Sequence, residues 1–328
     1  MSSKRDASEI LGDTLPELSK AQYRKRWSDF ETFLGGERKP IEDDYLQYFD
    51  HLHNEKKQKA STIWTTYSML NSIHQLNFGE KLQITFPRLT QLLKSYNANY
   101  ERKVASVFTI GEINQYLDID DTSPYVLVRK AIVVTAVSGG LRTSEMRELN
   151  FKDFVQLNGG YKVTLIRKKQ NGEKKPSVFF IPANFEKHIE LYSAAVTSEL
   201  GDAKGAFCKG KSNKFVDQPM GKNTLYGIGK DVATTLNLPN PGTYTGHCFR
   251  RSSATIAADG GATTQQLQRA FGWKSASTAQ KYVDESDAGA QAMASFFTSE
   301  TIHVQGSSSD AGKSYNIQAG EHSVFNFY

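Results

Sequence analysis

The sequence of 328 residues predicts a mainly α-helical protein with a small antiparallel β-sheet. Apolar side chains recur three and four residues apart along most of the chain, which is the spacing of helices that bury one face. Two runs rich in β-branched and aromatic residues, 161–166 and 177–181, interrupt this pattern. They are joined through Asn171-Gly172, a dipeptide that favours a tight hairpin turn, so we expect them to pair. The length is sufficient for two domains with separate cores.

Residues 13–104 are predicted to form a helical first domain behind a flexible, polar lead, residues 1–12. Pro16 suits the opening turn of the first helix, and Ser61 is expected to cap the third. The apolar stripes are Tyr23, Trp27, Phe30 and Leu34; Tyr45, Phe49 and Leu52; Ile63, Tyr67, Leu70 and Ile73; and Leu89, Leu92, Tyr96 and Tyr100, in a fourth helix spanning about 88–100. Basic residues beside these stripes either face nucleic acid or form a solvated surface.

A polar, basic stretch, 97–106, is expected to link this domain to a second one, residues 105–298. Thr109 and Glu112 have the spacing of a capping box, which predicts a new helix. The run 126–137 is apolar nearly all round, so we expect its helix to be buried.

After residue 183 we expect helices and loops only, until about residue 298. The tail, residues 299–328, begins as a Ser/Gly/Asp-rich linker and ends in two short strands around Gly320. The last helix carries an apolar face that a chain end cannot easily cover with its own core, so we expect it to dock on a neighbouring protomer. This face is made by Ala288, Ala292, Met293, Phe296 and Phe297.

The composition excludes several classes of protein. Two cysteines, Cys208 and Cys248, cannot form a disulfide framework, which indicates a reducing compartment. The N-terminus lacks the apolar core of a signal peptide, and no apolar run reaches the roughly 20 residues of a membrane span, so we expect no membrane partner. Neither a metal-ligand cluster nor a phosphate-binding glycine loop is present in the sequence, so no metal or cofactor is expected.

The net charge of +5 is mild, but its distribution points to a polyanion. Between residues 162 and 175 a cluster of basic residues faces a single acid, Glu173. Such a cluster is expected of a phosphate-binding surface, although alone it fits a solvated hairpin equally well. Its members are Lys162, Arg167, Lys168, Lys169, Lys174 and Lys175.

Basic side chains also lie where a phosphodiester could be held. His247 and Arg250 are three residues apart near the start of a helix, so they share one face. Arg142 follows a glycine-rich turn at the start of another helix, where backbone amides also favour phosphate. Glu145 lies three residues further on, close enough to hold a neighbouring basic group. Alone, each fragment also fits a structural histidine or a surface ion pair.

Tyr282 is the candidate nucleophile. It follows Gly272-Trp273 at a short interval and precedes an acidic segment, whereas helical core stripes explain most of the other tyrosines. A phenol has a pKa of about 10, so at neutral pH it needs cationic neighbours or a base. His247, Arg142 and Arg250 would supply both.

Together these motifs resemble the tyrosine recombinases of the phage integrase family, firmly over residues 107–298 and more loosely over 14–104. Segments 247–255 and 272–282 are most similar to the recombinases of eukaryotic crypton-type DNA transposons. One position departs from the commonest family pattern, because Trp273 stands where many members have histidine. The resemblance implies a helical core-binding domain followed by a tyrosine-recombinase catalytic domain. The motifs, in family order, are Arg142 with Glu145, the basic hairpin, His247 with Arg250, Gly272-Trp273 and Tyr282.

The resemblance also implies the chemistry. Tyr282 attacks the scissile phosphate, leaving a 3′-phosphotyrosyl bond and a free 5′-hydroxyl. Arg142 and Arg250 stabilise the transition state, His247 helps to take the tyrosine proton, and Trp273 donates its N–H to a phosphate oxygen. Lys169, with Lys168 as the second choice, protonates the departing 5′-oxygen. The expected contacts to duplex DNA are Arg24, Lys25, Lys57, Lys59, Arg167, Lys168, Lys174 and Arg251.

Two alternatives stay open from the sequence. A type IB topoisomerase uses the same groups, although the helical first domain and the close spacing of Trp273 and Tyr282 favour a recombinase. A catalytically inactive, transposase-derived DNA-binding protein is the other, although every role still has a candidate residue. A helical scaffold would require five coincidences in order, so we reject it. Strand exchange at paired sites implies a homotetramer on double-stranded DNA, located in the nucleus if the source is eukaryotic and otherwise in the cytoplasm.

Overall fold

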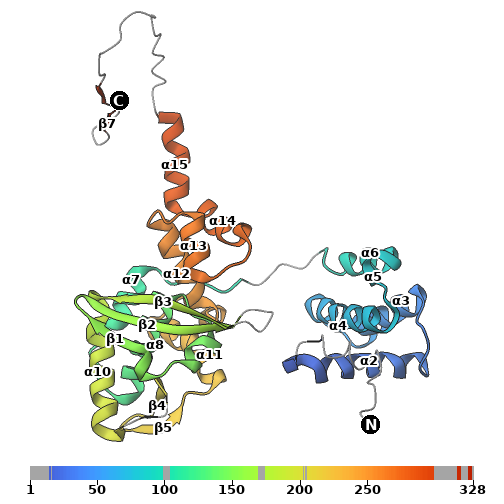
Figure 1. The fold of residues 1–328 in the computed structure, drawn as a ribbon, viewed down its shortest axis with the longest axis horizontal. Helices are drawn as coiled ribbons and strands as arrows, with labels where there is room; N and C mark the ends of the chain where they lie inside the picture. Colours follow the sequence, from blue (N-terminus) through green and yellow to red (C-terminus); the bar gives the residue numbers. More distant parts are fainter. Residues whose placement is uncertain are drawn as a thin grey trace, which may run out of the picture. The chain divides into compact units, whose positions relative to one another are not determined.

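The computed structural model divides the chain into two compact units, residues 1–103 and 104–328 (Figure 1). It describes residues 15, 17–98, 104–168, 174–201, 203, 205–298, 316–318 and 324–326. Helices predominate in both units, and every strand within these ranges belongs to the second unit. The predicted mainly helical fold with small antiparallel sheets is therefore confirmed.

The first unit packs its helices around an aromatic core. Phe30 stacks on Tyr45 with ring centroids 4.6 Å apart, and the Tyr45 hydroxyl lies 2.9 Å from Nδ1 of the buried His74. The elements are η1 (Glu17–Ser19), α2 (Lys20–Leu34), α3 (Glu42–Asp50), the π-helical turn η2 (His51–Glu55), α4 (Ala60–Phe78), α5 (Leu82–Thr85) and α6 (Pro87–Ser95).

The four predicted helices of this unit are present as α2, α3, α4 and α6, with three corrections. Lys59, not Ser61, is the N-cap of α4, because the helix already starts at Ala60. The helix expected over 88–100 ends at Ser95, and the short α5 was not predicted. The expected opening turn at Pro16 lies outside the described residues.

A buried helix, α8 (Pro124–Gly139), forms the centre of the second unit, as its apolar run predicts. Val128, Ile132 and Val134 on different sides of this helix are fully buried, since α10 (Ala183–Leu200), α12 (Cys248–Asp259) and strands of two sheets all contact it. The predicted capping box before α7 (Ile110–Leu117) is confirmed: the Glu112 N–H donates to Thr109 Oγ1, and the Thr109 N–H donates to Glu112 Oε2.

A three-stranded antiparallel sheet covers part of this core. It has the order β1 (Phe154–Leu157), β2 (Gly160–Lys168), β3 (Lys174–Pro182), so the predicted hairpin is present and β1 is an addition to it. Val163 and Leu165 on β2 are buried, whereas Ile166 is exposed. Successive side chains on a strand alternate in direction, so Arg167 follows Val163 and Leu165 onto the inner face. The hairpin tip, with Asn171-Gly172 and Lys169, lies outside the described residues.

The expectation of helices and loops alone between residues 183 and 298 is wrong, because two short strands occur there. β4 (Cys208–Gly210) pairs antiparallel with β5 (Phe215–Pro219). The register shifts between Cys208 and Lys209, and three residues are too few for an alternating pattern to be visible in a sequence. The remaining elements of the second unit before α12 are α9 (Thr143–Glu148), η3 (Phe151–Asp153), α11 (Lys222–Thr235) and η4 (Pro241–Thr243).

The C-terminal helices α13 (Thr264–Phe271), α14 (Ala276–Asp284) and α15 (Asp287–Thr298) follow α12 in the chain, and Figure 1 shows α15 leaving this group as an extension. The Asp287 N–H donates to Asp259 Oδ1 at 3.0 Å, which fixes the start of α15 on the end of α12. Further along, Met293 is 60% exposed. The predicted terminal strands, β6 (Asn316–Gln318) and β7 (Val324–Asn326), pair with each other. Within the described ranges, no helix is long and apolar enough to cross a membrane.

Candidate active site

The buried carboxylate of Glu145 lies among three arginines that come from three different elements. The helix α9 begins at Arg142, whose backbone N–H donates to Glu145 Oε2 at 2.8 Å and whose Nη1 donates to Oε1 at 2.7 Å. Arg167 Nε from β2 lies 3.6 Å from Oε1, and Arg250 Nη1 from α12 lies 4.0 Å from Oε2. Glu145 is only 9% exposed. The predicted role of this carboxylate, holding neighbouring basic groups, has a direct geometric basis here.

Arg250 is the most deeply buried of these cations, with a side chain 7% exposed. Its Nη1 donates to the Gly140 carbonyl at 2.6 Å and its Nη2 to the Phe271 carbonyl at 2.5 Å. Burial lowers the pKa of this guanidinium to about 10, and the charge of Arg142 adds to that effect while Glu145 opposes it. Arg250 therefore stays protonated at neutral pH.

Two of the predicted site residues, Arg142 and His247, are exposed to solvent. The Arg142 side chain is 42% exposed, and His247 is exposed at the N-cap of α12. The two segments are tied together, because Thr143 Oγ1 donates to the Gly246 carbonyl at 3.2 Å. Gly246 is required there: a Cβ at this position would lie 2.2 Å from Cδ2 of Tyr226.

A stack of three rings connects Tyr282 to the arginines. The Trp273 and Tyr282 rings are nearly parallel, at 4°, with centroids 5.3 Å apart. Trp273 also stacks on Phe271, with ring centroids 4.8 Å apart, and Arg250 Cζ lies 5.5 Å from the centroid of the Trp273 ring. The left-handed Gly272, with φ of +63°, allows the sharp turn from α13 into this stack. Trp273, predicted as an N–H donor, thus also positions the tyrosine through its ring.

Two residues expected to contact DNA are turned inward instead. Arg167 is 11% exposed, because it lies on the inner face of β2 and its Nη1 donates to the Ala270 carbonyl at 2.8 Å. Arg251 is half-buried and donates to the Ala105 carbonyl. The alternation of buried Val163 and Leu165 is the signal that could have placed Arg167, whereas the basic composition of the hairpin hid it.

The other expected DNA contacts fall into two groups. Arg24 and Lys25 are exposed on α2, and Lys57 and Lys59 are exposed in the segment before α4. The backbones of Lys168 and Lys174 are paired across the hairpin, but their side chains, like all of Lys169, lie outside the described part of the structure.

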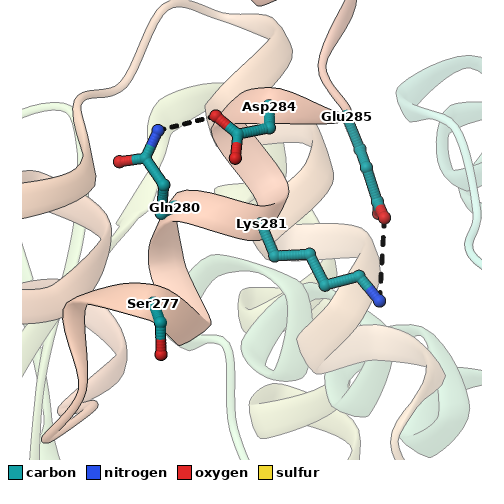
Figure 2. Close-up of a pocket in the computed structure, with 5 residues that line it drawn as sticks. All are labelled: Ser277, Gln280, Lys281, Asp284 and Glu285. Carbon is teal, nitrogen blue, oxygen red and sulfur yellow. Dashed lines mark hydrogen bonds and ion pairs between the residues drawn. The ribbon is translucent and has the colours of Figure 1, made fainter.

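A shallow hollow lies on a polar face of α14, but its chemistry does not suit a phosphate. The side chains in Figure 2 pair within the helix: Gln280 Nε2 donates to Asp284 Oδ1 at 2.6 Å, and Lys281 Nζ lies 3.6 Å from Glu285 Oε1. One lysine faces two carboxylates there, so the hollow offers a phosphate no excess of positive charge. The hollow is lined by Ser277, Gln280, Lys281, Asp284 and Glu285.

Comparison with known proteins identifies the class. The model of the phage integrase family matches residues 106–288. Tyrosine recombinase XerC of Rickettsia rickettsii (strain Sheila Smith) is 28% identical over 226 residues, covering 69% of this chain and 67% of the relative. Tyrosine recombinase XerD of Oceanobacillus iheyensis is 24% identical over 239 residues, covering 71% and 74%.

Solved structures share the fold. XerH recombinase bound to palindromic difH substrate has a TM-score of 0.62 at 18% identity, covering 86% of this chain and 80% of that one. The Tn1549 transposon integrase in complex with circular intermediate DNA has a TM-score of 0.58 at 19% identity, covering 89% and 99%. The chain therefore belongs to the phage integrase family. It is a tyrosine recombinase, a class of enzymes that cleave and rejoin DNA.

We expect Glu145→Gln to lower the free energy of unfolding by about 3 kcal/mol, because three guanidiniums lose their shared counter-charge. It also removes the charge that opposes the lowering of the Arg250 pKa, so that pKa falls further below about 10. Loss of DNA cleavage on the alkaline side then begins at a lower pH than in the parent.

Urea unfolding followed by circular dichroism, together with a pH profile of cleavage, tests this expectation. Glu285→Gln is the matched control, because its 59% exposed ion pair with Lys281 contributes at most about 1 kcal/mol. Equal stabilities of the two variants would contradict the central role of Glu145.

Proposed function

We propose that this chain is an active site-specific recombinase in which Tyr282 attacks the scissile phosphate of duplex DNA. The single observation that carries the proposal is the continuous path from the Tyr282 ring through Trp273 to the Arg250 guanidinium. A phenol is held beside a cluster of buried and half-exposed cations, which is the arrangement that nucleophilic attack on a phosphodiester requires.

The charges of the cluster suit the transition state. Arg142, Arg167 and Arg250 contribute three positive charges and Glu145 one negative charge, so the cluster carries a net charge of two. A phosphodiester carries one negative charge, and the pentacoordinate state reached during attack carries about two. The cluster therefore matches the transition state better than the ground state. Arg250 can still take part, because each Nη has a second hydrogen beyond the one given to a carbonyl.

The proposed step is a displacement at phosphorus by the tyrosine oxygen. The Tyr282 oxygen forms a bond to phosphorus, its proton passes to His247, and the bond from phosphorus to the 5′-oxygen breaks. Lys169 gives a proton to that oxygen, with Lys168 as the second choice, and the product is a 3′-phosphotyrosine. The helix α12 begins directly after His247, and backbone amides at a helix N-terminus favour a phosphate. Arg142 and Arg250 bind the non-bridging oxygens, and the Trp273 N–H donates to one of them. Neither metal nor nucleotide is consumed.

We expect Tyr282→Phe to abolish covalent protein–DNA adducts, because it removes the attacking oxygen and keeps the ring stack. The assay incubates the protein with a library of nicked duplexes, without metal or nucleotide, and separates adducts by denaturing electrophoresis. Tyr125→Phe is the control, since Tyr125 packs on Arg129, a pair outside the proposed machinery. Adducts that survive in Tyr282→Phe would show that another residue is the nucleophile. Selective binding without adducts in the parent would indicate an inactive DNA-binding protein.

Lys169→Ala should lower the cleavage rate about 10²–10⁴-fold, the usual contribution of a general acid, while Lys168→Ala has a mild effect. A substrate with a bridging sulfur in place of the 5′-oxygen separates the two lysines further. A thiolate leaves without protonation, so this substrate should restore cleavage by Lys169→Ala. If this substrate restored cleavage by Lys168→Ala and not by Lys169→Ala, the general acid would be Lys168 instead.

We further propose a homotetramer on paired DNA sites, in which the apolar face of α15 docks on a neighbouring protomer. The exposure of Met293 and the fixed start of α15 support this arrangement. Met293→Glu should then preserve binding to a single site and block recombination, whereas Gln291→Glu, also exposed on α15, changes neither. Band shifts and a two-site recombination assay measure the two steps. Full recombination by Met293→Glu would contradict the docking.

The origin and location of the protein are also proposals. The amino-acid sequences of segments 247–255 and 272–282 support a crypton-type transposon recombinase, whereas the relatives named above are bacterial XerC and XerD proteins. A nuclear location follows if the source is eukaryotic, and a cytoplasmic one otherwise. The exposed basic residues of α2 and of the segment before α4 support duplex binding by the first unit as well.

A further inference from the structure

Two arginines join the same pair of helix ends. Arg250 donates to the Gly140 carbonyl, at the end of α8, and to the Phe271 carbonyl, at the end of α13. Arg167 donates to the preceding carbonyl of each pair: its Nη2 lies 3.3 Å from Gly139 O and its Nη1 2.8 Å from Ala270 O. The two guanidiniums thus form a double clasp between α8 and α13.

The clasp accounts for the last carbonyls of α13. The final four carbonyls of a helix have no partner within the helix and carry partial negative charge, so they favour cations. In α13 the first two are satisfied locally, because the N–H groups of Trp273 and Gly272 donate to Gln268 O and Arg269 O. The last two, those of Ala270 and Phe271, accept from Arg167 and Arg250.

The position of α13 decides where the reacting groups lie. The chain passes from Phe271 through Gly272 into Trp273, and the Trp273 ring stacks on Tyr282. Arg167 also lies against this turn, since a Cβ on Gly272 would be 3.1 Å from Arg167 Nη1. A shift of the α13 end therefore moves both rings relative to the arginines.

The two members of the clasp differ in what else they must do. In the proposed reaction Arg250 also binds the scissile phosphate, through the Nη hydrogens that are not given to the two carbonyls. Arg167 is 11% exposed, and its only acidic neighbour among the described residues is Glu145, 3.6 Å from Nε. Arg167 therefore serves the clasp alone, whereas Arg250 serves both the clasp and the substrate.

We infer that Arg167 is a positioning residue for strand cleavage, which holds the end of α13 on the end of α8 and so keeps Trp273 and Tyr282 aligned with Arg250. This inference rests on the proposed function. It assigns Arg167 a task inside the protein, in contrast to a DNA contact or a general contribution to core stability.

The test compares Arg167→Gln and Arg167→Lys with Arg269→Gln. Arg269 is exposed on the same helix that Arg167 holds, so its variant removes the same charge without opening the clasp. Arg167→Gln should lower the rate of adduct formation about 10²-fold, which is the scale of a misplaced reacting group, without changing duplex affinity. The rate of adduct formation by Arg167→Lys should lie between those of the parent and of Arg167→Gln, because one ammonium cannot span both carbonyls as the guanidinium does.

A spectroscopic measurement on the free protein separates positioning from stability. The chain has three tryptophans, of which Trp27 and Trp64 belong to the first unit. In protein labelled with 5-fluorotryptophan, Arg167→Gln should shift and broaden the ¹⁹F resonance of Trp273, assigned with Trp273→Phe. The resonances of Trp27 and Trp64 should stay unchanged and serve as internal controls.

The outcomes are distinct. Adduct formation by Arg167→Gln at the parent rate, or its loss with an unmoved Trp273 resonance, overturns the inference. If Arg167→Gln does not fold, Arg167→Lys, which keeps a charge beside Glu145, provides both readouts under the same criteria. If the parent forms no Tyr282-dependent adduct, the proposed function fails, and the Trp273 resonance still decides whether Arg167 holds the turn.

Discussion

The second unit depends on one buried carboxylate that is shared by three guanidiniums. Taking Glu145 and the arginines out of water costs several kcal/mol per ion, and close opposite charges with good hydrogen bonds offset that cost. The contacts join α9, β2 and α12, which are far apart in the sequence. Without the carboxylate, Arg142, Arg167 and Arg250 would repel one another at short range. With it, the cluster keeps an excess of positive charge and still packs inside a domain.

Backbone carbonyls also hold two of these cations, Arg167 and Arg250, through hydrogen bonds. The ends of α8 and α13 both point carbonyl groups at the arginines, so helix termini that would need water are satisfied by charged side chains. Gly140 allows the contact, because its φ is +54° and a Cβ there would lie 2.0 Å from Cε1 of Phe271. Substitution of this glycine would separate the two helix ends directly.

Local patterns predicted the elements that local patterns determine. The apolar run of α8, the capping box at Thr109 and the two β-rich runs of the β2–β3 hairpin are all visible in neighbouring residues. The pairing of β4 with β5 depends on a shifted register between two short segments, so no local pattern marks it.

In the site, too, features set by neighbouring residues could be predicted, and features set by contacts between distant residues could not. The helical spacing of His247 and Arg250 predicted a shared face, but two contacts of the clasp, Arg167 to Ala270 and Arg250 to Gly140, join residues more than a hundred positions apart. Arg167 illustrates the difference. The basic composition of its segment predicts a contact with DNA. Its position on the inner face of β2 and its hydrogen bond to the distant Ala270 carbonyl place it inside the domain.

The distribution of exposure explains how such a site can be ready before a substrate arrives. Arg167 and Arg250 are buried and fixed by carbonyls, whereas the Arg142 and His247 side chains are exposed to solvent. Dipoles and charges that are fixed in advance stabilise a transition state without reorganising during the reaction. The free-energy cost of removing Arg167 and Arg250 from water is offset during folding, by their contacts with Glu145 and with the carbonyls of the helix ends. In the proposed reaction, substrate binding then has to order only the exposed side chains of Arg142 and His247.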